Sequence, residues 1–111
     1  MNNKRRKDLE IVANHIRSLM EGSKKPEKKE FEGIAEKLTD IADEEDDATM
    51  NMPENLFATD RYQDMLDNMC DIMDAATKVN DVVAGYGTLK WTGCKAKLNA
   101  AIKSIYLAIN R

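Results

Sequence analysis

The chain has 111 residues and a formal net charge of −3 at pH 7, and 42% of its residues are hydrophobic and 33% are charged. This length and composition predict one globular domain and exclude an intrinsically disordered chain. No apolar run approaches the ~20 residues that a membrane-spanning helix needs, so we expect a soluble, cytoplasmic protein.

Two segments with helical periodicity, 4–21 and 27–48, occupy the first half of the chain. We expect Gly22 to end the first in a left-handed C-cap, and Ser23 and Pro26 to begin the second. Apolar residues that repeat at intervals of three and four predict the buried faces. They are Leu9, Val12, Ile16 and Leu19 in the first segment, and Phe31, Ile34, Leu38 and Ile41 in the second.

Two further helical segments, 60–84 and 89–110, occupy the second half. Asp60 followed by Gln63 resembles a capping box at the start of the third segment, and Thr88 is expected to cap the fourth. The predicted stripe of the third segment is Met65, Met69, Ile72, Ala76, Val79 and Val83, widened by Tyr62, Leu66 and Met73.

Residues 1–111 therefore predict a single all-α domain, because no alternating run of β-branched residues indicates a strand. Four helices of similar length joined by short breaks favour an up-down four-helix bundle. The alternative is a long helical hairpin that completes its core by forming a homodimer.

Charge is segregated along the chain. Residues 1–29 carry a balance of +5, residues 30–58 carry −9, residues 59–87 carry −4 and residues 88–111 carry +5. Antiparallel neighbours would then pair basic with acidic segments, which is a structural interpretation of the pattern.

The densest run of charge lies near the predicted end of the second helix and consists of Asp43, Glu44, Glu45, Asp46 and Asp47. The helix dipole disfavours anions at this end, so a solvated and frayed terminus is one interpretation. The functional interpretation is an acidic patch for a basic partner. A calcium loop is not expected, because the run lacks alternating ligands and a central glycine.

Six aspartates recur at helical spacing in the third segment: Asp60, Asp64, Asp67, Asp71, Asp74 and Asp81. Helical geometry places them within an arc of about 100°, away from the apolar stripe, so they are expected to face solvent or a partner. Carboxylates one turn apart lie about 5–6 Å from each other, which is of the order of phosphate spacing in nucleic acid. The row is thus a candidate partner-binding surface for a basic groove, and an ordinary solvated face is the alternative.

No residue is expected to have a catalytic, metal-binding or cofactor-binding role. A metal-dependent nucleotide pyrophosphatase would aim such carboxylate pairs into a cleft, and the chain has no Glu-x-x-His motif. Cys70 and Cys94 are expected to be reduced and half-buried, although a bridge between them stays open, and His15 is expected beside Ile16 at the edge of the apolar stripe rather than as a ligand. Direct nucleic-acid binding by residues 4–7 is opposed by the isoelectric point near 5.2.

Residues 51–76 resemble a segment of small acidic helical proteins encoded in prophages of Gram-positive bacteria. There, an Asn-x-Pro-Glu-Asn-Leu turn precedes a Ser/Asp-Arg-Tyr cap and a long acidic helix. The matching residues here are Asn51, Pro53, Glu54, Asn55, Leu56, Asp60, Arg61 and Tyr62. The matched segment covers about a quarter of the chain. The last predicted helix, with Trp91, lies outside the pattern. The resemblance implies a phage or mobile-element origin and no assigned activity.

Together these features favour a binding protein that inhibits a basic, nucleic-acid-handling host protein, such as an anti-CRISPR-like nuclease inhibitor, through an acidic helix face. The first alternative is a structural or adaptor bundle without a charge-specific partner. The second is a carboxylate-metal nucleotide hydrolase.

Overall fold

A computed structural model describes residues 1–22 and 24–111. Ser23, one of two residues predicted to begin the second helical segment, lies outside the described residues. The elements are α1 (Asn3–Glu21), α2 (Lys28–Met50), the short 3₁₀ helix η1 (Glu54–Leu56), α3 (Asp60–Ala84) and α4 (Trp91–Ile109). Each α-helix begins and ends within two residues of the position expected from the sequence.

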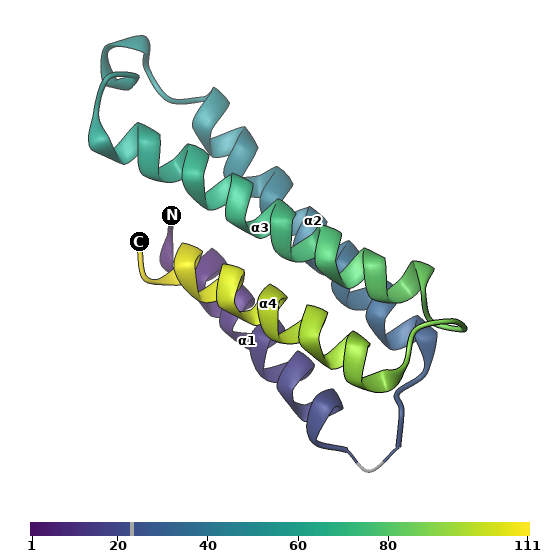
Figure 1. The fold of residues 1–111 in the computed structure, drawn as a ribbon. Coiled ribbons are helices and arrows are strands. Elements are labelled where there is room, and N and C mark those ends of the chain that lie inside the picture. Colours follow the sequence, from purple (N-terminus) through teal and green to yellow (C-terminus); the bar gives the residue numbers. More distant parts are fainter. Residues whose placement is uncertain (23) are drawn as a thin grey trace.

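The helices pack as an all-α, up-down bundle, which confirms the predicted fold class. α3 packs along α2 and α4, its neighbours in the chain, and α1 closes the ring by contacting α4 and α2 less extensively. Figure 1 shows α2 and α3 as a long hairpin against the shorter pair α1 and α4. One chain therefore closes its own core around four helices.

The bundle is elongated, with principal extents of 50 × 21 × 18 Å. The loop between α2 and α3, with the helical turns that flank it, projects beyond the ends of α1 and α4 (Figure 1). We refer to residues 50–62 as the hairpin tip. The projection exposes apolar side chains at the tip, because neither α1 nor α4 extends far enough to cover it.

The buried face of α2 follows the predicted period: Phe31, Ile34, Leu38 and Ile41 are all buried. In α1, Leu9, Val12 and Ile16 are buried and Leu19 is half-buried. Burying such a side chain contributes roughly 1.5–3 kcal/mol, so these stripes supply much of the favourable free energy of folding.

The buried face of α3 is rotated relative to the prediction. Its buried residues are Met65, Asn68, Ile72, Ala75, Ala76, Val79 and Val82. Met73, predicted to widen the stripe, is exposed, whereas the polar Asn68 is buried and accepts a hydrogen bond of 3.1 Å from Arg111. The rotation brings one edge of the aspartate row closer to α4 than the sequence suggested.

Three predicted caps differ from the structure. The side chain of Thr59, not Asp60, caps α3 by accepting a hydrogen bond of 3.3 Å from the Tyr62 amide. Gly22 is the C-cap of α1, as expected, but its backbone angles are extended (φ −64°, ψ 151°) rather than left-handed. α4 begins after Lys90 without a side-chain cap, two residues beyond the predicted Thr88. Asp60 remains in the first turn of α3, where the helix dipole favours its charge.

Candidate partner-binding surface

The aspartate row divides into two halves that differ in their surroundings. In the first half, Asp60 is exposed and Asp64 and Asp67 are half-exposed. Asp67 accepts a hydrogen bond of 3.0 Å from the Gln63 side chain, one turn earlier. None of these three carboxylates forms an ion pair with a residue that the structure describes.

The second half of the row lies against α4 and against Arg111, two residues beyond the end of α4. Asp71 forms an ion pair of 2.7 Å with Arg111, and Asp81 forms one of 3.6 Å with Lys97. Asp74 accepts a hydrogen bond of 2.7 Å from Ser104 and also pairs with Lys78. These contacts match acidic α3 with basic α4, as the charge segregation indicated, and this half of the row helps to hold the two helices together.

Asp74 makes the stability of the protein depend on pH. Hydrogen bonds from Lys78 and Ser104, together with the charge of Lys78, hold the pKa of Asp74 below its ordinary value of 3.8. A carboxylate with a lowered pKa in the folded state stabilises the protein above the ordinary pKa, and this contribution disappears as the pH falls through the lowered value.

We therefore expect Asp74→Asn to unfold at a lower urea concentration than the wild type at neutral pH, and the gap to close in strong acid. The gap should be small, because the Asp74 side chain is 49% exposed and water screens its charge. Urea unfolding of both proteins, from neutral pH to strong acid, measures the difference between their midpoints. In a Ser104→Ala background the Asp74→Asn gap should shrink, and an unchanged gap would contradict the role given to Ser104.

The acidic run is not a frayed helix end, because α2 continues through it to Met50. Asp43 and Asp47 are exposed, Asp46 is half-buried, and Glu44 forms a surface ion pair of 3.7 Å with Lys4. The expectation that Glu45 faces a partner is wrong, because its side chain is 0% exposed.

Glu45 instead joins α2 to the start of α1. Its Oε2 accepts a hydrogen bond of 3.1 Å from Arg5 Nε, and its Oε1 lies 3.9 Å from the amino group of Met1. Oε1 itself has no hydrogen-bond partner among the described residues. A buried charge is costly unless it is paired, so the position of Glu45 depends on Arg5 and the amino terminus.

A second acidic row, which the sequence analysis did not single out, runs along the outer face of α2. Its members are Glu32, Glu36, Asp40, Asp43 and Asp47. All five are exposed, and none forms an ion pair with a residue in the described part of the chain. The first three also line a hollow of about 280 Å³ whose far side includes Asn80 of α3. The spacing of 4, 4, 3 and 4 residues is readable in the sequence.

Apolar side chains gather at the hairpin tip, beside these acidic residues. Met50 is 72% exposed and Phe57 is 42% exposed, and Leu56 also reaches solvent. The Phe57 ring stacks on Tyr62 with a centroid distance of 4.8 Å. This small apolar surface is of the kind that anchors protein interfaces.

Residues with catalytic or metal-binding chemistry are scattered. Cys70 is exposed and Cys94 is buried, and both are free thiols. His15 lies on α1 and pairs with Glu30 at 3.5 Å, remote in the sequence from the aspartate row. Within the described ranges, no three His, Cys, Asp or Glu side chains come together as they would around a metal ion. No described helix is both long and apolar enough to cross a bilayer.

Comparisons with protein-family models, with curated proteins and with solved structures find no match to this chain.

Proposed function

We propose that the chain is a small binding protein that inhibits a basic, nucleic-acid-handling host protein by presenting an acidic helical face to it. The observation that carries the proposal is the row of five exposed carboxylates on α2 that have no cationic partner among the described residues. Asp60, Asp64 and Asp67, near the start of α3, also form no ion pair with a described residue.

Geometry favours a partner whose groove is built for nucleic acid. The carboxylates project from a helix that packs on α3, so their positions are fixed before binding. Successive charges lie about 5–6 Å apart, which is of the order of phosphate spacing. A concentrated acidic surface also accelerates encounter with a basic partner at low salt.

The resemblance of residues 51–76 to prophage-encoded proteins supports a partner in the defence systems of the bacterial host, for example a nuclease.

The alternative of a structural or adaptor bundle has support from a different observation. Asp71, Asp74 and Asp81 are occupied by contacts to α4 or to Arg111, so we leave this half of the aspartate row out of the proposed surface.

Neutralising four of the five carboxylates of the α2 row should weaken inhibition about tenfold while the fold survives. The variant carries Glu32→Gln, Glu36→Gln, Asp40→Asn and Asp43→Asn, all at exposed positions where substitutions usually change stability by about 0.5 kcal/mol or less each. Proteins from a Gram-positive host lysate are bound to DNA-cellulose and eluted with the wild-type chain or the variant at low salt. We expect the variant to need roughly tenfold more protein for the same elution, since steering and complementarity are lost.

A matched control removes the same number of charges elsewhere, with Glu10→Gln, Glu21→Gln, Glu27→Gln and Glu54→Gln, all exposed. Both variants raise the net charge by four, so net charge alone cannot separate them. The control should elute the same proteins as the wild type. Equal elution by the two variants would show that the α2 row is not the binding surface, and no elution by the wild type would contradict the proposal as a whole.

A further inference from the structure

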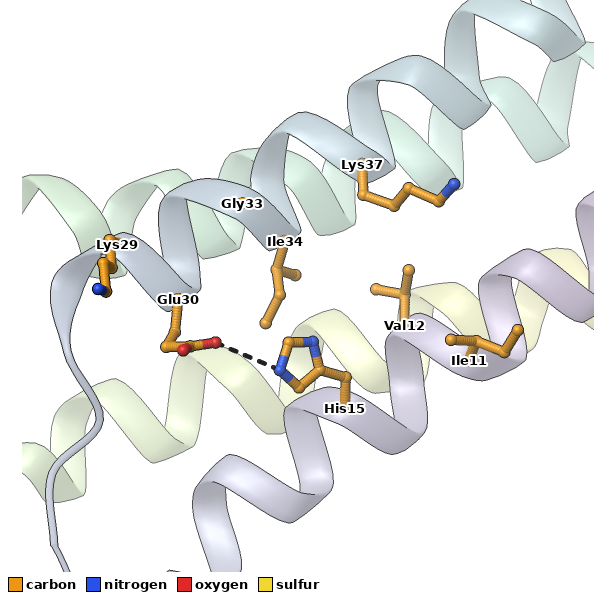
Figure 2. Close-up of a pocket in the computed structure, with 8 residues that line it drawn as sticks. All are labelled: Ile11, Val12, His15, Lys29, Glu30, Gly33, Ile34 and Lys37. Atoms are coloured by element: carbon orange, nitrogen blue, oxygen red, sulfur yellow. Dashed lines mark ion pairs between the residues drawn. The ribbon is translucent and has the colours of Figure 1, made fainter.

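The seam between α1 and α2 is open on the outside of the bundle. A cavity of about 400 Å³ lies between the two helices, which is within the range of ligand sites (Figure 2). Its lining residues are Ile11, Val12, His15, Lys29, Glu30, Gly33, Ile34 and Lys37. The seam is open because α1 and α2 contact each other less extensively than α2 and α3 do.

The floor of this groove is apolar. Val12 and Ile34 are buried beneath it, and Ile11, on the α1 edge, is 65% exposed. Gly33 leaves open space on the α2 side of the groove, because it has no side chain. A Cβ atom added there would meet no atom within 4 Å. The exposed Ile11 on α1 and the open space at Gly33 on α2 leave room for apolar side chains from outside the molecule.

Two lysines lie on the rim of the groove. Lys29 and Lys37 lie on the α2 side, eight residues apart, which corresponds to about 12 Å along a helix. Glu30, the acidic residue of the lining, lies 3.5 Å from His15 Nε2, as the dashed line in Figure 2 marks. Lys37 forms no ion pair with any described residue, and the partner of Lys29 is the exposed Glu27.

We propose that this groove binds an amphipathic helix of a partner protein, with acidic residues flanking its apolar stripe. Two helices bound the groove, so a third helix can lie along it with apolar side chains on Ile11, Val12 and Ile34. Acidic residues about two turns apart would then reach Lys29 and Lys37. The occupant is not a second copy of this chain presenting its outer α2 face, because that face is charged throughout and lacks an apolar stripe.

The proposal is independent of the acidic row, which takes a basic partner. A test uses a fluorescent 16-residue helical peptide with leucine at positions i, i+4, i+7 and i+11 and glutamate beside them, and a second peptide with lysine in place of glutamate. Fluorescence anisotropy at low salt measures binding to the full chain. The glutamate peptide should bind at least tenfold more tightly than the lysine peptide.

Gly33→Leu should fill the groove and weaken binding of the glutamate peptide at least tenfold without unfolding the protein. The matched control is Gly93→Leu, since Gly93 is also an exposed helical glycine with open space around its Cβ position, on α4 and outside the groove lining. The control should bind as the wild type does. Equal binding by the two leucine variants would overturn the proposal.

Removing the rim charges with Lys29→Gln and Lys37→Gln should weaken binding severalfold and flatten its salt dependence. The control is the double variant Lys90→Gln, Lys103→Gln. Both positions are exposed, Lys90 at the N-cap of α4 and Lys103 within α4. The control should change neither the affinity for the glutamate peptide nor its salt dependence. Dodecanoate serves as a small anionic competitor. If dodecanoate binds and the glutamate peptide does not, or if both peptides bind equally, the assignment of an acidic helix to this groove is overturned.

Discussion

Replacing Glu45 with alanine is expected to destabilise the protein by about 3–5 kcal/mol, the usual cost of breaking a buried ion pair. The substitution leaves Arg5, which is itself largely buried, and the amino group of Met1 without their carboxylate. For a chain of about this size, 1 kcal/mol corresponds to about 4 °C in Tm, so we expect Tm to fall by about 12–20 °C. Circular dichroism during heating measures the change.

The neighbouring Glu44→Ala is a matched control, because Glu44 is exposed and its pair with Lys4 is a surface pair worth about 0–1 kcal/mol. The double variant Arg5→Met, Glu45→Leu should recover much of the lost stability, since apolar side chains can replace a buried ion pair. If Glu45→Ala had the same Tm as Glu44→Ala, the buried ion pair would contribute little to the stability of the protein.

Phe31→Ala is expected to cost about 3–5 kcal/mol, the range for removing a large aromatic side chain from a core. Phe31 is fully buried near the start of α2, and its ring lies 6.1 Å from the Trp91 ring at the start of α4. The substitution leaves a cavity where two helices meet. Urea unfolding measures the loss, and quenching of Trp91 fluorescence reports whether the indole becomes accessible.

The second phenylalanine of the chain provides the control. Phe57 is partly exposed at the hairpin tip and contacts Tyr62, so Phe57→Ala should cost about 1 kcal/mol or less. Similar losses for the two substitutions would contradict the assignment of Phe31 to the core.

The sequence was sufficient to predict the helices and the buried face of α2, because the period of Phe31, Ile34, Leu38 and Ile41 is a local signal. The orientation of α3 was not predictable in the same way. Asn68 is buried through its contact with Arg111, 43 residues away, whereas the apolar Met73 is exposed. Burial at these positions is decided by α4, which the local pattern does not contain.

The acidic run shows a similar limit. Five consecutive residues of a helix span more than a full turn, so one of them must face the bundle, and Glu45 does so because Arg5 lies opposite. The identity of that residue depends on a contact across 40 positions. The α2 row, in contrast, could have been predicted from its spacing. The partner-binding surface was instead predicted on α3, because aspartates are denser there.

The projecting hairpin tip has a consequence for local unfolding. Residues near the tip are packed by fewer neighbouring helices than residues in the middle of the bundle, as Figure 1 shows for the ends of α2 and α3. Opening of the last turns of α2 and the first turns of α3 therefore exposes little core, and their amide protons should exchange with solvent faster than those around Leu38 and Ile72. A partner that binds the hairpin tip would slow this exchange. The pattern of amide protection would therefore show where the partner binds.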